Sequence, residues 1–203
     1  MANRSHLYTC DDIPPKDGFY ARGLSEYNWD VPLVHKVMMA NAPRVVRSAI
    51  WARDIGVLAE RAGAFERTLA FFARIGEGDL PARDGFDAEL AEMRAFLGAT
   101  PPTKYLLLEA GEIFSVMGGD LVEHARRLVG EIADLGARVD RAIAGGEAPW
   151  LAHARELAEG GAPRLVERGA VLQLRAGRGR ARIVVVARHQ VRWKRCALVP
   201  LQS

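Results

Sequence analysis

The sequence has few of the residues by which metal proteins are usually identified. Only two of its 203 residues are cysteines, Cys10 and Cys196, and they lie near opposite ends of the chain. No Cys-x-x-Cys pair is present, which argues against a structural zinc site. We expect both cysteines to be free thiols, because disulfides are rare in the cytoplasm.

Motifs for nucleophiles and phosphates are also missing. The chain has five serines, and none of them lies in a Gly-x-Ser-x-Gly sequence. Neither a P-loop nor Gly-x-Gly-x-x-Gly is present, and Gly177-Arg178-Gly179 is too short to cradle a phosphate. None of the five histidines has another at a spacing of three or four. We therefore expect no cofactor and no metal, and the motifs identify no catalytic residue.

Long apolar runs are absent as well. The run Ile183–Ala187 has five residues, whereas a membrane-spanning helix needs about 20. The first residues lack the apolar stretch of a secretory signal, so we expect a cytoplasmic protein that does not enter a membrane. Hydrophobic residues make up 49% and charged residues 26% of the chain, as in an ordinary globular domain.

The order of predicted elements indicates an α+β fold. Residues 4–9 and 55–58 read as strands, residues 10–23 as a loop, and a short helix is expected from Pro43. Helices are predicted near 33–38, 64–75, 84–97, 121–144 and 150–159, while residues 105–116 fit either a strand or a helix. A hairpin is predicted at 171–188 and a further strand at 191–198. We expect central helices and a small antiparallel sheet formed by this hairpin, which the N-terminal strand at residues 4–9 could join.

We interpret residues 1–203 as a single domain with a sub-boundary near 160–163, where positive charge begins to concentrate. Residues 161–203 contain ten basic residues and one acid, Glu167, and so carry +9. The whole chain carries +3, which leaves −6 for residues 1–160. This split indicates either an acidic partner or packing of the basic segment on the acidic remainder.

Aromatic and basic side chains supply the candidate partner-binding residues. An exposed aromatic ring after a loop is a good binding anchor, whereas a buried ring covers the core. The cations of the hairpin could contact a partner or neutralise phosphates, with Trp193 stacking on a base. No established nucleic-acid-binding motif is present, so nucleic acid is the less favoured partner. The candidates are Tyr27, Trp29, Arg178, Arg180, Arg182, Arg188, Arg192 and Lys194.

Glu109 and Glu112 are the candidates for acid–base chemistry. Their spacing would place both carboxylates on one face of a helix, between apolar neighbours. Paired carboxylates can transfer protons or hold a metal when burial shifts their pKa values. The alternative is that one or both cap or salt-bridge a neighbouring segment.

Two segments resemble a bacterial family of small uncharacterised proteins. Its members open with Met-Ala-Asn-Arg-Ser-Tyr-Leu-Tyr and continue with a Ser-Glu-Tyr/Trp-x-x-Asp-x-Pro segment, and here residues 1–8 and 23–32 match, with His6 in place of the aromatic residue. Residues 104–114 are similar to a second landmark of the family. The resemblance implies no catalytic residue. The family's members look like the immunity proteins that accompany secreted bacterial toxins.

Three hypotheses follow. The first is a bacterial immunity protein, antitoxin-like, that binds a cognate secreted toxin and blocks its active site, using electrostatic complementarity for speed and specificity. The second is a nucleic-acid-binding accessory protein that uses the basic hairpin, with affinity that falls steeply with salt. The third is an enzyme that uses Glu109 and Glu112, which requires both carboxylates in one pocket and a raised pKa on one of them.

Overall fold

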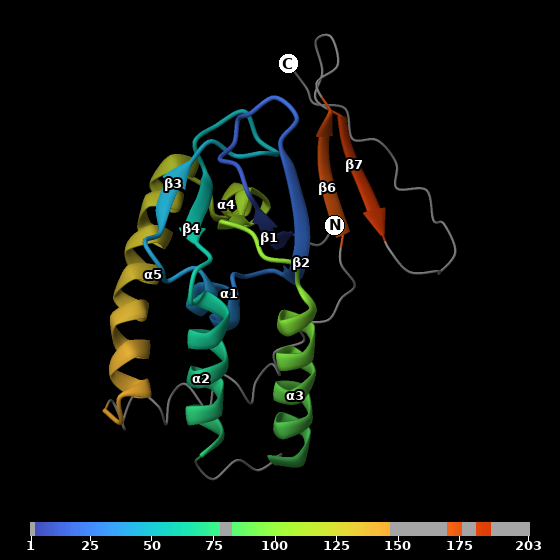
Figure 1. Ribbon diagram of the computed structural model, residues 1–203. Helices are drawn as coiled ribbons and strands as arrows, with labels where there is room; N and C mark the ends of the chain where they lie inside the picture. The colour runs from blue at the N-terminus through green and yellow to red at the C-terminus, as the bar shows by residue number, and fades with distance from the viewer. Residues whose placement is uncertain (1–2, 78–82, 147–169, 176–181, 188–203) are drawn as a thin grey trace.

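A seven-stranded sheet forms the centre of the molecule (Figure 1). The computed structural model describes residues 3–77, 83–146, 170–175 and 182–187. The strands are β1 (Arg4–Cys10), β2 (Tyr20–Asn28), β3 (Arg44–Val46), β4 (Gly56–Glu60), β5 (Tyr105–Glu109), β6 (Ala170–Arg175) and β7 (Arg182–Ala187). The helices are α1 (Leu33–Met38), α2 (Ala64–Gly76), α3 (Arg83–Ala99), α4 (Gly111–Met117) and α5 (Leu121–Ile143).

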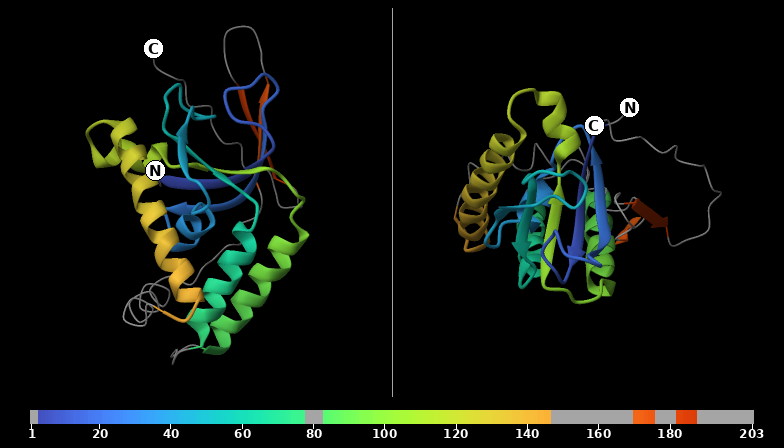
Figure 2. Two further views of the ribbon diagram at one scale, coloured as in Figure 1. Left: turned by 60° about the vertical axis from the view of Figure 1, so that its left-hand side comes forward. Right: turned by 90° about the horizontal axis from the view of Figure 1, so that it is seen from above.

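The strand order is β3-β4-β5-β1-β2-β6-β7, and every neighbouring pair is antiparallel. Strand β1 therefore lies in the middle of the sheet, paired with β2 on one side and β5 on the other. Helices α2 and α3 lie side by side beyond one end of the strands, and α5 runs along the β3 side (Figures 1 and 2). The β6–β7 hairpin extends the sheet beyond β2.

The two faces of the sheet bury different apolar clusters, because successive residues of a strand point to opposite faces. Leu7 and Leu108 belong to the large core that also contains Phe71 of α2 and Ile132 of α5. A smaller cluster covers the other face. It consists of Tyr8, Cys10, Phe19, Ala21, Leu58 and Leu107, with Ala49 and Ile50 of the β3–β4 loop packed against it.

Helix α5 forms where the sequence predicts the longest helix. The Asp120 side chain accepts hydrogen bonds from the backbone N–H groups of Val122 and Glu123, as expected of a helix N-cap. The apolar face of α5 joins the large core. Gly136 permits close packing, since a Cβ at this position would lie 3.0 Å from the Cβ of Ala40.

The α+β class is confirmed, but the expected arrangement of strands is wrong. We expected a small sheet built by the C-terminal hairpin. Instead, β1 to β5 form most of the sheet, and β6 adds to it through the register of Tyr20 with Gln173 and Arg22 with Val171. The N-terminal strand shares a sheet with the hairpin without pairing with it, because β2 lies between them.

Two local predictions are also wrong. The loop ends before Tyr20 and not at Gly23, because Gly23 pairs with Tyr8 inside β2, next to a bulge in the register. The helix expected from Pro43 is strand β3, whose β-branched Val45 and Val46 suit pairing with β4. The helix predicted at 150–159, the boundary at 160–163 and the strand at 191–198 lie outside the described residues.

Candidate functional site

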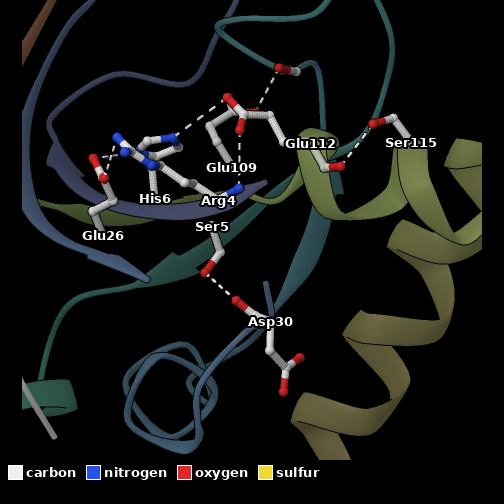
Figure 3. A network of polar contacts seen from close by, with 9 residues as sticks. Arg4, Ser5, His6, Glu26, Asp30, Glu109, Glu112 and Ser115 are labelled. Carbon is white, nitrogen blue, oxygen red and sulfur yellow. Dashed lines mark hydrogen bonds and ion pairs between the residues drawn. The ribbon is translucent and has the colours of Figure 1, made fainter. Parts of the chain in front are cut away.

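A network of charged side chains lies where β1 begins, β2 ends and α4 starts (Figure 3). Arg4 and His6 come from β1, Glu26 from β2 and Glu112 from the first turn of α4. His6 and Glu26 are cross-strand partners, so their side chains share one sheet face. Three segments that are distant in the sequence therefore meet at one polar surface.

The charged groups of this network are paired closely. The Arg4 guanidinium lies 2.5 Å from Glu26 Oε1, and the backbone N–H of Arg4 donates to Glu112 Oε2 over 3.0 Å. His6 lies between the two acids, with Nδ1 3.5 Å from Glu26 and Nε2 4.0 Å from Glu112. The His6 ring also stacks on Tyr8, with 6.1 Å between ring centroids.

Burial sets the protonation of His6. It lowers the pKa of the imidazole, and it outweighs the two carboxylates, which act to raise that pKa. His6 is therefore neutral at pH 7. A neutral imidazole has a single N–H, so His6 can donate to only one of the two carboxylates at a time.

A third acid, Glu109, lies deeper on the same sheet face, since it is the cross-strand partner of His6. It ends β5 and is 1% exposed. Ser48 Oγ donates to its Oε2 over 2.7 Å, and the N–H of Ala49 donates to its Oε1 over 2.7 Å. Ser48 Oγ in turn accepts from the N–H groups of Ile50 and Trp51. Glu109 thereby fastens the β3–β4 loop to the sheet.

Burial raises the pKa of Glu109 to about 7, and the hydrogen bonds from Ser48 and Ala49 limit the rise. A carboxyl group with this pKa has the protonation equilibrium of a general acid or base. The contacts of Glu109 favour a structural role over a catalytic one, because each of its carboxylate oxygens already accepts a hydrogen bond from the β3–β4 loop.

Gly111 completes the attachment of the loop. A Cβ at Gly111 would lie 2.4 Å from Trp51 Nε1, so the indole can pack here only against a residue with no side chain. Residues 109–112, part of the second landmark noted in the sequence, thus have three roles. Glu109 binds the β3–β4 loop, Gly111 leaves room for Trp51, and Glu112 belongs to the charged network. The partner residue Ser48 was missed, because nothing near it in the sequence indicates a carboxylate 61 positions away.

The expectation that Glu109 and Glu112 share a helix face is wrong. Glu109 is the last residue of β5, whereas Glu112 lies in the first turn of α4, because Ala110 and Gly111 change the direction of the chain. The Glu112 side chain is 44% exposed and Glu109 is buried, so the two carboxylates differ in their contact with water. The contacts of both residues agree with the alternative interpretation, in which each carboxylate binds a neighbouring segment: Glu109 binds the β3–β4 loop and Glu112 binds β1.

Trp29 extends from the same end of the sheet. It is 64% exposed and has a φ of 70°, in the left-handed region that a bulky residue rarely adopts. The backbone N–H of Trp29 donates to the carbonyl of Asn3 over 2.6 Å, and Ser5 Oγ donates to the carbonyl of Asp30 over 2.7 Å. These hydrogen bonds attach the backbone of the turn to β1, and the tryptophan that the turn carries is largely exposed.

The other predicted partner-binding residues are placed differently. Tyr27 is half-buried on β2. Arg182 is the first residue of β7 and pairs with Arg175. Arg178, Arg180, Arg188, Arg192 and Lys194 lie outside the described residues, as does Cys196. Cys10 is buried and free, and burial raises the pKa of its thiol to about 12.

A family model described as Domain of unknown function (DUF7822) matches residues 13–149. The chain belongs to this family. No curated protein and no solved structure matches it. The DUF7822 match begins in the β1–β2 loop and ends after α5, so it includes Glu26, Trp29, Ser48, Glu109 and Glu112 but not β1 itself.

In the part of the chain that the structure describes, no group of three or more His, Cys, Asp or Glu side chains is arranged to hold a metal ion. None of the helices in this part of the chain is long and apolar enough to cross a bilayer.

Proposed function

We propose that this protein is an immunity protein that binds a cognate bacterial toxin and blocks its active site. The turn at Asn28–Val31 and the charged network beside it form the contact surface in this proposal. We name this surface the Trp29 edge and define it as Trp29, Asp30, Arg4, Glu26 and Glu112.

The observation that carries the proposal is the exposure of Trp29 on a fixed turn. A large aromatic side chain at 64% exposure has no role in the core. Tryptophan is among the residues that contribute most to protein–protein binding when it is buried by a partner. Because the backbone of the turn is already held by Asn3 and Ser5, little backbone conformational entropy is lost when a partner covers the indole.

The charges around Trp29 favour a basic partner surface. Glu26, Asp30 and Glu112 contribute three carboxylates, against the single cation of Arg4, while His6 is neutral. Toxins that act on nucleic acids need basic active sites, since their substrates are polyanions. An acidic edge with an aromatic anchor would complement such a site and exclude the substrate from it.

Co-purification tests the proposal. The tagged chain is expressed together with the products of its neighbouring genes and washed at high salt. A single protein partner in one-to-one ratio, whose toxicity the chain suppresses, is the expected result. Recovery of nucleic acid that salt removes would support the basic hairpin as the functional surface instead, and recovery of no partner would count against both.

A further inference from the structure

The last two residues of helix α4 carry exposed apolar side chains. Val116 is 60% and Met117 is 57% exposed, whereas Ile113 and Phe114 of the same helix are buried in the core. We name this pair the α4 tip and define it as Val116 and Met117. Single exposed apolar side chains are common on protein surfaces, so the meaning of the pair depends on what lies beside it.

The backbone around the α4 tip is held in place. Gly118 and Gly119 follow the tip with φ values of 71° and 83°, a conformation that turns the chain into α5. His124 Nε2 donates to the carbonyl of Gly118 over 2.5 Å, and the His124 ring stacks on Phe114. Asp120 then caps α5. A partner that covers the tip therefore meets a backbone that is already ordered, which lowers the entropic cost of binding.

Glu112 lies one helical turn before Val116. Residues four apart in a helix are neighbours on one face, with about 5 to 6 Å between their Cβ atoms. The Glu112 side chain is 44% exposed and forms no ion pair with a lysine or arginine among the described residues. Its Oε2 accepts the N–H of Arg4, whose guanidinium pairs with Glu26 instead, and the nearby His6 is neutral (Figure 3). A carboxylate without a cation thus lies next to an exposed apolar side chain.

We propose that the outer face of α4 is a second contact for the toxin, where Glu112 pairs with a lysine or arginine and the α4 tip enters an apolar recess beside that cation. Lysine and arginine suit this place, because the charged end reaches a carboxylate while the methylene stem covers an apolar side chain such as Val116. Glu112 and Glu26 would repel a nucleic acid or an anionic membrane, which favours a basic protein surface. The inference rests on the proposed function and adds a contact on a different element from Trp29.

Oxidation of Met117 by hydrogen peroxide tests this contact. The samples are the full chain alone and its complex with the protein partner recovered by co-purification, and mass spectrometry measures the sulfoxide at each methionine. In the chain alone, Met117 should oxidise about ten-fold faster than the buried Met38 and Met93, and the complex should slow it by about ten-fold. Unchanged oxidation of Met117 in a one-to-one complex would overturn the proposal. Protection that increases with the concentration of the chain alone would also overturn it, because the occupant would then be a second copy.

Variants separate the charge from the apolar contact. Glu112→Gln keeps an oxygen that can accept the N–H of Arg4, and Val116→Asn removes the apolar side chain next to it. Each should weaken toxin binding about ten-fold, and Glu112→Gln should also reduce its dependence on salt. Asp134→Asn and Ile143→Asn, both exposed on α5, are the matched controls and should leave binding unchanged. Unchanged affinity in a Glu112→Gln or Val116→Asn variant that urea unfolding shows to be folded would refute the assignment.

The same measurements distinguish this proposal from the proposed function. If Trp29→Asn weakens toxin binding while Glu112→Gln and Val116→Asn do not, the toxin binds through Trp29 without α4, and only the contact at α4 is refuted. If co-purification recovers no toxin, both proposals are refuted.

Discussion

Ser48 Oγ donates a hydrogen bond to Glu109 Oε2 over 2.7 Å, and both residues are buried. The contact joins the β3–β4 loop to the last residue of β5. Because the same hydroxyl accepts two backbone N–H groups, its proton is directed at the carboxylate. The loop conformation and the ionisation of Glu109 are therefore linked.

This link predicts a pH-dependent stability. The pKa of Glu109 is about 7 in the folded protein and 4.5 in the unfolded chain, so the folded state binds more protons between these values. The free energy of unfolding should then fall as pH rises from about 4.5 to 7, by about 2 to 3 kcal/mol. Glu109→Gln, which cannot titrate, should remove this component.

Urea unfolding of the parent protein and of Glu109→Gln at pH 5 and pH 7.5 measures the effect. The difference between the two proteins isolates Glu109 from other titrating groups. Stability profiles that run parallel across this range would show that Glu109 does not titrate there.

Removal of the buried Ser48 hydroxyl should destabilise the protein more than removal of the exposed Ser115 hydroxyl. Ser48→Ala leaves a buried carboxylate oxygen and two backbone N–H groups without a partner, at an expected cost of about 2 to 3 kcal/mol. Ser115→Ala removes an exposed hydroxyl that bonds the Glu112 carbonyl, and it should change stability by less than about 0.5 kcal/mol. Equal effects in urea unfolding would refute the role of Ser48.

Gly111→Ala should destabilise the protein, whereas Gly130→Ala should not. The new Cβ at position 111 would overlap the Trp51 ring, so the β3–β4 loop must shift, at a cost of about 1 to 3 kcal/mol. Gly130 lies in α5 with nothing within 4 Å of its Cβ position, so alanine there should stabilise the helix by up to about 1 kcal/mol. Thermal unfolding of both variants decides this, and a neutral Gly111→Ala would mean that Trp51 packs elsewhere.

His35 should make the protein sensitive to acid. It is fully buried in α1, and neither ring nitrogen has a hydrogen-bond partner in the part of the chain that the structure describes. Burial, with a smaller effect of His6, lowers its pKa to about 3. The unfolded chain therefore binds more protons below the ordinary pKa of 6.5, and stability should fall by about 2 kcal/mol from pH 6.5 to pH 5.

His35→Leu is the test of that sensitivity. Since the imidazole makes no hydrogen bond among the described residues, an apolar side chain of similar size should cost little at pH 7 and should flatten the loss toward pH 5. An unchanged slope in this variant would show that other groups cause the acid sensitivity.

The sequence predicted local elements better than their assembly. The strand at Arg4–Cys10 and the helices at 64–76 and 121–143 follow from periodicity and from the Asp120 cap, which act within a few residues. The position of β1 in the middle of the sheet depends on pairing with β5, about 100 residues away. No local signal specifies such pairing. Gly23 in β2 is typical of a loop, so the sequence did not indicate that this segment is a strand paired with both β1 and β6.

The candidate site was predictable to the same extent. Trp29 and Glu112 could be selected as an aromatic after a loop and as one of two nearby acids. Their meeting with Arg4, His6 and Glu26 required the order of the strands. The exposure of Trp29 depends on a left-handed residue in the turn, and that conformation is unexpected for tryptophan.

The most direct test of the proposed function is protection from the cognate toxin by Trp29→Asn. Asparagine tolerates the left-handed backbone, so this variant should keep the fold and lose only the indole. Ile143→Asn, which removes another exposed apolar side chain at the end of α5, is the matched control. We predict that Trp29→Asn weakens toxin binding at least ten-fold and abolishes protection in co-expressing cells, while Ile143→Asn protects fully. Full protection by a folded Trp29→Asn variant would contradict the assignment of the Trp29 edge as the toxin-binding surface.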